Sequence, residues 1–247
     1  MPMLDCASMS QRLQTHENQM GELREVQFWF HQGDQHVPGL LYLPVNHEEK
    51  MPFVLIQHPG MGSKEDYFVA EIARAWARRG WICGGLDAPL HGERAGADPM
   101  ALFRNPERYP EIRAQFAAEV STMLDLLVDA FPIDTGRIGF VGYSMGSMLG
   151  IPAVARDGRF KAAAFCLVGE GGLAGSADGP ESDIAKLDKT AVRVVGKLQD
   201  QLIPREKTEA LYQSLPGEKD IRWLPGTHFE IGPDVIKLAE EWMVSHL

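Results

Sequence analysis

The stretch RIGFVGYSMG (137–146) sets one serine, Ser144, between a short apolar run and the start of a helical pattern. The apolar run predicts a buried strand, so the Gly-x-Ser-x-Gly motif occupies a strand-to-helix turn. Small residues are needed at Gly142 and Gly146, because side chains there would collide with the adjoining strand and helix. The Ser144 hydroxyl is therefore expected to project from the carboxyl edge of a sheet, where open α/β folds bind their ligands.

Apolar runs and helical patterns alternate on both sides of this turn. Right-handed crossover connections convert such an order into a mostly parallel sheet with helices on both faces. The sequence therefore predicts a three-layer α/β/α sandwich, with an antiparallel N-terminal hairpin formed by 26–32 and 37–45. The predicted central strands are 53–57, 81–86, 137–141, 162–168, 192–197 and 221–224, and the predicted helices are 67–79, 111–131, 145–156, 204–215 and 233–246.

Length, charge and cysteine content narrow the function classes. The 247 residues are expected to form a single domain, 1–247, and residues 1–20 show no clear period, which suits a mobile arm or a short helix. A formal net charge of −10 disfavours nucleic-acid and membrane-surface partners. Three widely spaced cysteines and an N-terminus without a signal-peptide pattern favour a reducing, cytoplasmic location. The oligomeric state stays open, a homodimer included.

Two residues downstream of Ser144 are suited to activate its hydroxyl. A serine is a poor nucleophile without a base, and the base needs a carboxylate to orient it. His228 follows the last predicted strand on a loop, whereas the other downstream histidine, His246, lies at the end of the last helix. Asp200 follows the strand before, which gives the chain order Ser, Asp, His. Glu170, at the end of a still earlier strand, is the alternative acid.

Donors for a developing oxyanion are expected at two places. The amide of Met145, at the start of a helix, supplies one of them. The second is expected from the loop HPGMGSKED (58–66), whose proline has no N–H, which leaves Gly60 or Met61. Glycine allows a close backbone approach, so Gly60 is preferred. His58 is expected to anchor this loop by a hydrogen bond rather than to act as a base.

Together these motifs resemble the α/β-hydrolase superfamily. Within it, the chain is similar to compact serine esterases such as dienelactone hydrolase and bacterial carboxylesterases of that type. The resemblance covers about 26–247, nearly the whole chain. It rests on HPGMGSKED (58–66), DAPLHGER (87–94), GYSMG (142–146) and the loops that carry Asp200 and His228.

This resemblance implies roles for individual residues. Ser144 would be the nucleophile, His228 the base and Asp200 its partner, and the amides of Gly60 and Met145 would form the oxyanion hole. Dienelactone hydrolase itself uses a cysteine where this chain has Ser144, which argues against the lactone reaction. Family members usually read His-Gly where this chain reads His-Pro-Gly, which leaves the first oxyanion amide open.

The expected activity is the hydrolysis of small or short-acyl carboxylic esters through an acyl-enzyme, without metal or cofactor. Thioester or peptide cleavage, perhydrolysis and carbon–carbon bond hydrolysis are alternatives on the same scaffold, as is a non-catalytic ligand-binding relative. The segments 91–110 and 169–187 are expected to cover the active site. They are too short to form a cap domain, so the site is expected to be shallow. Arg94, Arg104 and Arg108 are candidates for binding an acidic substrate group, although such arginines are more often solvated.

Overall fold

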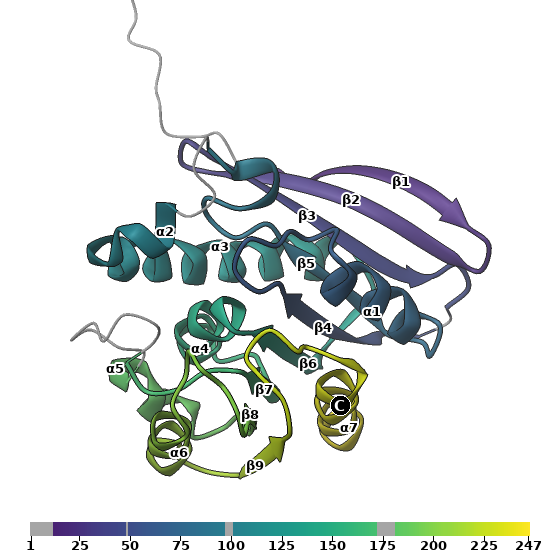
Figure 1. Cartoon of the computed structure of the whole chain (residues 1–247). Coiled ribbons are helices and arrows are strands. Elements are labelled where there is room, and N and C mark those ends of the chain that lie inside the picture. The colour runs from purple at the N-terminus through teal and green to yellow at the C-terminus, as the bar shows by residue number, and fades with distance from the viewer. Residues whose placement is uncertain (1–11, 48, 97–100, 172–180) are drawn as a thin grey trace, which may run out of the picture.

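The computed structural model describes residues 12–47, 49–96, 101–171 and 181–247. In these residues, Figure 1 shows one nine-stranded sheet in the order β1-β2-β3-β5-β4-β6-β7-β8-β9. Strands β4 to β9 run parallel, whereas β1, β2 and β3 are antiparallel, as the sequence predicts for the N-terminal hairpin. The strands are β1 (Gln14–Met20), β2 (Leu23–Gln32), β3 (Gln35–Pro44), β4 (Met51–Gln57), β5 (Ile82–Leu86), β6 (Ile133–Tyr143), β7 (Ala162–Cys166), β8 (Ala191–Lys197) and β9 (Lys219–Leu224).

Helices cover both faces of this sheet, which makes the three-layer prediction correct. On β4, Phe53 and Leu55 face one core layer, whereas Val54 and Ile56 face the other. A strand buried in this way is apolar along its whole length because neither side meets water. Helices α1 (Tyr67–Ala77) and α7 (Pro233–His246) pack on one face, and α3 (Tyr109–Ala130), α4 (Met145–Asp157) and α6 (Arg205–Ser214) on the other.

Short helical turns complete the described elements. They are η1 (Gly92–Arg94), α2 (Ala101–Arg104), η2 (Pro106–Arg108), α5 (Glu181–Ile184) and η3 (Ala185–Leu187), and they fall within the two predicted roof segments. The remaining parts of those segments, 97–100 and 172–180, lie outside the described residues. None of the helices in the described ranges is long and apolar enough to cross a bilayer.

The N-terminal segment differs from its prediction. Residues Gln14–Met20 form β1, which pairs antiparallel with β2 from Gln14 opposite Trp29 to Met20 opposite Leu23. All seven residues are exposed, so they lack the apolar alternation from which a strand can be predicted. The expectation of a mobile arm or a helix is therefore wrong for 14–20, and 1–11 lie outside the described part of the chain.

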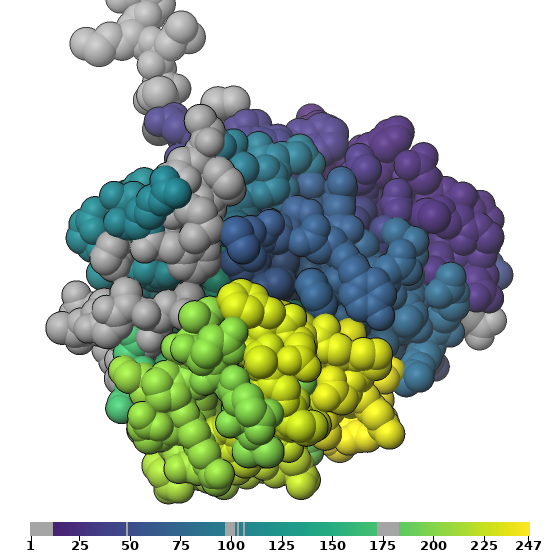
Figure 2. All heavy atoms as spheres, viewed as in Figure 1, coloured from purple at the N-terminus to yellow at the C-terminus, as the bar shows by residue number. Residues whose placement is uncertain are grey.

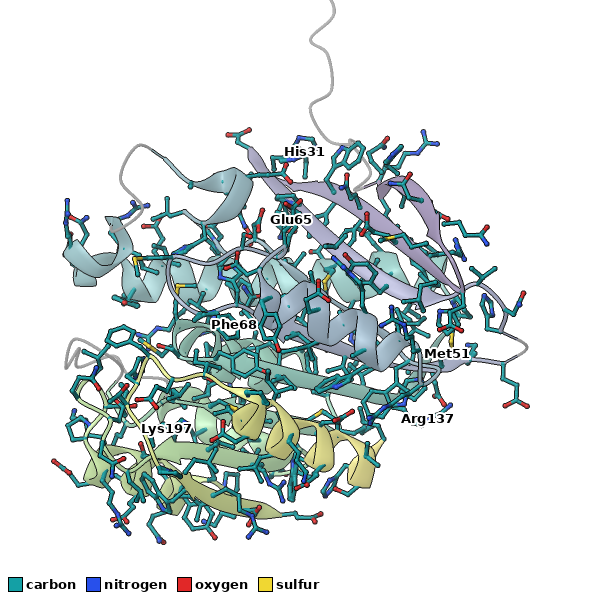
Figure 3. All side chains as sticks on the ribbon, turned by 45° about the vertical axis from the view of Figure 1, so that its right-hand side comes forward. His31, Met51, Glu65, Phe68, Arg137 and Lys197 are labelled. Carbon is teal, nitrogen blue, oxygen red and sulfur yellow. The ribbon has the colours of Figure 1, made fainter. Side chains whose placement is uncertain are left out.

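The parallel strands bring the candidate site to one edge of the sheet. Figure 3 shows Met51 and Arg137, from the first parts of β4 and β6, on one side of the molecule. Phe68, in the first turn of α1, and Lys197, at the end of β8, lie towards the other side. Because β6 ends at Tyr143, Ser144 lies at this second side, together with the loops that follow β4, β5, β8 and β9.

Candidate active site

Ser144 occupies a strained turn. Strand β6 ends at Tyr143 and α4 begins at Met145, so Ser144 alone separates the strand from the helix. Its backbone has φ 51° and ψ −112°, which is uncommon for a residue with a side chain. Such a conformation costs on the order of 1–3 kcal/mol and persists only where the surrounding structure enforces it. Strain of this kind points to a position where function decides the backbone conformation.

Close backbone contacts explain the two glycines of the motif. A Cβ atom at Gly142 would lie 2.6 Å from the Ser147 amide nitrogen, and one at Gly146 would lie 2.4 Å from the Gln57 carbonyl oxygen. These neighbours are backbone atoms, which cannot rotate away as a flexible side chain can. The predicted need for small residues is confirmed. Because Gly146 touches the end of β4, the Ser144 turn packs directly against the loop that follows β4.

Hydrogen bonds to β7 fix the same turn. The Ser144 amide donates to the Cys166 carbonyl oxygen at 2.8 Å. The fully buried Ser147 hydroxyl accepts the Cys166 N–H at 2.9 Å and lies 2.7 Å from the Gly142 carbonyl oxygen. Sequence reasoning did not single out Ser147. Ser147 could have been recognised as a hydroxyl in the first turn of an otherwise apolar helix, because a buried hydroxyl there needs a hydrogen-bond partner from the backbone.

The structure brings Ser144 and His228 together although 84 residues separate them. His228 lies on the loop between β9 and α7, and its Nε2 is 2.8 Å from Ser144 Oγ. On the face shown in Figure 2, the yellow C-terminal segment lies against a blue segment, and a depression of about 210 Å³ between α1 and α7 is lined by Tyr67 and Pro233 but by neither Ser144 nor His228. Ser144 is 7% exposed and His228 is 4% exposed, so both residues are almost completely shielded from water.

Asp200 completes the arrangement. Its Oδ2 lies 2.7 Å from His228 Nδ1, and its Oδ1 accepts the amides of Leu202 and Ile203, each at 2.8 Å. Burial alone would raise the pKa of Asp200, but the hydrogen bonds from His228 and the Ile203 amide outweigh it and lower that pKa. An ionised Asp200 accepts a proton donor at Nδ1, which leaves Nε2 of His228 as the acceptor that faces Ser144.

The alternative acid does not reach the histidine. Glu170 is exposed, and its amide donates to the Lys207 carbonyl oxygen at 2.9 Å. The carboxylate beside His228 is thus the one on the loop after β8, as the sequence predicted.

Two glutamines that the sequence did not reveal join the Asp200 and His228 loops. The Gln199 side-chain oxygen accepts the Gly226 N–H at 2.6 Å, and the Gln199 amide donates to the Gly226 carbonyl oxygen at 3.1 Å. The His228 amide donates to the Gln201 side chain at 3.2 Å. These residues flank Asp200 on both sides, so adjacency to a predicted acid is the signal that could have found them.

The backbone amides of Gly60, Met61 and Met145 lie at this edge, and none of the three has a hydrogen-bond partner among the described residues. Gly60 and Met61 form the centre of a tight turn, which the Gly62 amide closes by donating to the Pro59 carbonyl oxygen at 3.2 Å. Met61 adopts φ 65° in this turn. Helix α4 leaves the Met145 amide without an intrahelical acceptor because that amide lies in its first turn. All three N–H groups are therefore unpaired hydrogen-bond donors.

His58 anchors the loop after β4, as predicted. Its Nε2 accepts the Ala88 amide at 3.1 Å, and its Nδ1 lies 2.8 Å from the Pro59 carbonyl oxygen. The side chain is fully buried, and this burial lowers the pKa of His58 to about 4. His58 is therefore neutral at pH 7. Nowhere in the described residues do three or more His, Cys, Asp or Glu side chains form a metal-binding group.

Arg94, one of the three arginines considered for binding an acidic substrate group, instead binds another side chain of the protein. The Arg94 side chain makes two hydrogen bonds, at 2.8 and 2.7 Å, to the buried carboxylate of Glu119. A guanidinium committed in this fork geometry has little left for a substrate, so the interpretation of Arg94 as an acid-binding or solvated residue is wrong. Arg104 and Arg108 are exposed, and Arg108 lies 3.8 Å from Glu111.

Comparison with known families agrees with this geometry. A model of the dienelactone hydrolase family matches residues 37–226, which is well over half of the chain. The match begins within β3 and ends in the His228 loop, so it includes the Ser144 turn and Asp200. A search of curated proteins finds no significant match.

Solved structures show the same fold. A PEG-bound cold-adapted esterase from an Arctic intertidal metagenomic library is 23% identical, with a TM-score of 0.80 over 94% of this chain and 97% of that one. An acetyl xylan esterase from Paenibacillus sp. R4 is 17% identical, with a TM-score of 0.75 over 96% and 89%. A putative dienelactone hydrolase from Klebsiella pneumoniae is 17% identical, with a TM-score of 0.68 over 95% and 99%. By its family match, the chain belongs to the dienelactone hydrolase family and is an enzyme of the carboxylic ester hydrolase class.

Proposed function

We propose that the protein hydrolyses small or short-acyl carboxylic esters through a Ser144–His228–Asp200 triad and an acyl-enzyme intermediate. The observation that carries this proposal is the continuous relay of two short contacts. They are 2.8 Å from Ser144 Oγ to His228 Nε2 and 2.7 Å from His228 Nδ1 to Asp200 Oδ2. The structural neighbours named as esterases support the same class of reaction.

In the first half-reaction, Ser144 Oγ attacks the ester carbonyl carbon while its proton moves to His228 Nε2. The ionised Asp200 stabilises the imidazolium that forms. The tetrahedral intermediate then collapses and breaks the bond to the alcohol oxygen. That oxygen takes the proton from Nε2, so the alcohol leaves and the acyl group stays on Oγ.

The second half-reaction uses the same groups in reverse. His228 Nε2 takes a proton from a water molecule, whose oxygen adds to the acyl carbon. When this intermediate collapses, the bond to Ser144 Oγ breaks and Oγ recovers the proton from Nε2. The carboxylic acid is released, and the resting arrangement is restored.

Free backbone amides supply the other half of catalysis. The Met145 amide and the amide of Gly60, with Met61 as the alternative, would donate to the carbonyl oxygen as it becomes negative. Losing one such donor costs on the order of 3 kcal/mol of transition-state stabilisation, which is comparable with a large part of the proton relay. The proposed hole is therefore a second large contribution to catalysis beside the proton relay, although the loss of one donor costs less than the loss of His228.

The described parts of the two roof segments support a small substrate. Leu102, Ile184 and Leu187 are at most 2% exposed, so these helical turns pack on the core instead of forming a cap. We expect the rate to be highest for acetyl to butyryl esters. An extra methylene contributes about 1–3 kcal/mol only where a fitted pocket contacts it. A rate that rises steadily for acyl chains beyond about eight carbons would therefore require a deep pocket and would contradict a shallow site.

The test is hydrolysis of p-nitrophenyl acetate by Ser144→Ala beside Ser147→Ala. Ser144→Ala should remove turnover and keep the wild-type circular dichroism spectrum. Ser147→Ala changes a serine three positions away whose hydroxyl bonds only to backbone, so it should lower stability by about 1–3 kcal/mol and lower turnover far less than Ser144→Ala does. Wild-type turnover in Ser144→Ala would refute the proposed triad.

A further inference from the structure

The loops 58–66 and 87–94 interlock through a buried ion pair. The Lys64 amide donates to Asp87 Oδ1 at 2.8 Å, and Lys64 Nζ donates to Asp87 Oδ2 at 3.1 Å. Nζ also contacts the Glu93 carboxylate. Lys64 is 3% exposed and Asp87 is fully buried, so water screens their attraction only weakly. A single lysine thus ties the loop after β4 to the loop after β5.

The second loop is shaped around the Asp87 carboxylate. The Glu93 amide donates to Asp87 Oδ2 at 2.9 Å. Gly92 adopts φ 54°, and a Cβ atom there would lie 2.1 Å from the Asp87 carboxyl carbon. Only glycine fits this position, because a side chain would expel the carboxylate that binds Lys64. The loop after β5 is therefore built to hold Asp87 against Lys64.

The turn with the free amides lies between two anchors to the same loop. On one side of the turn, His58 Nε2 accepts the Ala88 amide at 3.1 Å. On the other side, Lys64 binds Asp87. The tight turn 59–62, which presents the unpaired amides of Gly60 and Met61, spans the chain between these anchors.

Stability alone does not account for a lysine at this position. Burying an ammonium and a carboxylate carries a desolvation penalty, and well-packed apolar replacements of such pairs are often neutral or stabilising. We propose that Lys64 is a positioning residue, whose pair with Asp87 holds the turn 59–62 so that a free amide meets the developing oxyanion. This inference rests on the proposed ester hydrolysis, because it concerns a donor to that reaction's intermediate.

Two substrates that differ only in the carbonyl atom can measure how well the oxyanion hole donates hydrogen bonds. A thionoester carries a C=S group in place of C=O, and its sulfur is a weaker hydrogen-bond acceptor than oxygen. An intact oxyanion hole therefore favours the oxoester over the thionoester. Misplaced donors reduce this preference, whereas a general loss of folded enzyme lowers both rates equally. The quantity to measure is the ratio of kcat/KM for the two esters.

The variant is Lys64→Met, which removes the ammonium and keeps most of the stem. Lys197→Met is its matched control, because Lys197 is also 3% exposed but bonds to the Pro225 carbonyl oxygen, in the loop before His228. Lys64→Met should lower kcat for the oxoester about 10- to 100-fold with little change in KM, since complete loss of a donor costs about 100- to 1,000-fold. Its oxoester-to-thionoester ratio should fall about tenfold, whereas Lys197→Met should keep the wild-type ratio.

Each outcome decides the question. An unchanged ratio in folded Lys64→Met, or an equal fall in Lys197→Met, overturns the positioning role while leaving the proposed function intact. If Lys64→Met does not fold, Glu93→Gln replaces one exposed partner of Lys64 Nζ, and its ratio should fall about threefold, as part of the full donor effect. An unchanged ratio there overturns the role as well. A wild-type enzyme without esterase activity would instead refute the proposed function itself.

Discussion

His228 and His58 lie at the same edge of the sheet and use their rings in the same way, yet they face different partners. In each ring the hydrogen-bond pattern places the proton on Nδ1 and leaves Nε2 as an acceptor. His228 donates to a carboxylate and accepts from the Ser144 hydroxyl. His58 donates to the Pro59 carbonyl oxygen and accepts from the Ala88 amide.

This difference separates a base from an anchor. A hydroxyl can pass its proton to the imidazole, and the carboxylate stabilises the cation that results. A backbone amide keeps its proton, and a carbonyl oxygen stabilises a cation far less. The identity of the residue is the same in both loops, so the partners decide the role. The site therefore has two halves. The proton-moving half consists of Ser144, His228 and Asp200, and the anchoring half consists of His58 and the loop 58–66, which holds backbone amides in place.

Replacement of His228 should give the largest loss of activity, because it removes the base of the proton-moving half. His228→Ala leaves Ser144 without a base, and we expect kcat for p-nitrophenyl acetate to fall on the order of 10⁵-fold or more. His246→Ala is the matched control, because His246 lies at the far end of α7 and bonds to the Trp242 carbonyl oxygen. Stopped turnover in the control, or wild-type turnover in His228→Ala, would contradict the assignment.

Asp200→Asn tests the tautomer argument. The amides of Leu202 and Ile203 both donate to Oδ1, so an asparagine would place its oxygen there and turn its NH₂ group towards His228 Nδ1. Nδ1 would then have to accept, and Nε2 would carry the proton that Ser144 needs to lose. We expect kcat to fall about 10⁴-fold with unchanged folding. A loss of less than about tenfold in steady-state assays would show that Asp200 does not set the tautomer.

His58 makes the anchoring half sensitive to acid. Its folded-state pKa of about 4 lies below the ordinary value of 6.5, so between these values the unfolded chain binds the proton and the folded chain does not. This stability is complete above pH 6.5 and is lost as the pH falls towards 4. At pH 5 we expect a loss of about 2 kcal/mol relative to pH 7.5. Urea unfolding should show His58→Asn losing about 2 kcal/mol less than the wild type over this range.

Gln199 gives the smallest expected effect. Gln199→Ala removes the side-chain bond to the Gly226 amide and keeps the backbone bond between the same two residues. An exposed neutral hydrogen bond contributes about 1 kcal/mol, so we expect a few-fold loss of kcat and little change in unfolding midpoint. A loss as large as that of Asp200→Asn would mean that Gln199 does more than join the two loops.

The sequence predicted the proton-moving half well because its signals are local. Ser144 is marked by two glycines whose Cβ atoms would collide with backbone, and this requirement is written in five consecutive residues. Asp200 and His228 each follow directly after a predicted strand of a parallel sheet, and the carboxyl ends of such strands meet at one edge. Chain order then sufficed to bring together residues that are far apart in the sequence.

The anchoring half was only partly predictable because its partners lie on different loops. Lys64 and Asp87 are separated by 23 residues, and nothing in either motif states that one binds the other. Arg94 was expected to be solvated or to meet substrate, but helix packing brings Glu119 to it from α3. β1 escaped prediction for a related reason, since an exposed strand paired by backbone alone carries no apolar pattern.

Covalent labelling tests the central claim most directly. A fluorophosphonate reacts readily only with an activated serine, so intact-mass analysis of the wild type after brief exposure should show one adduct, and peptide mapping should place it on Ser144. Ser144→Ala should remain unlabelled, and His228→Ala should react at least about 100-fold more slowly because its serine lacks a base. An adduct on another serine, or labelling of His228→Ala at the wild-type rate, would contradict the account.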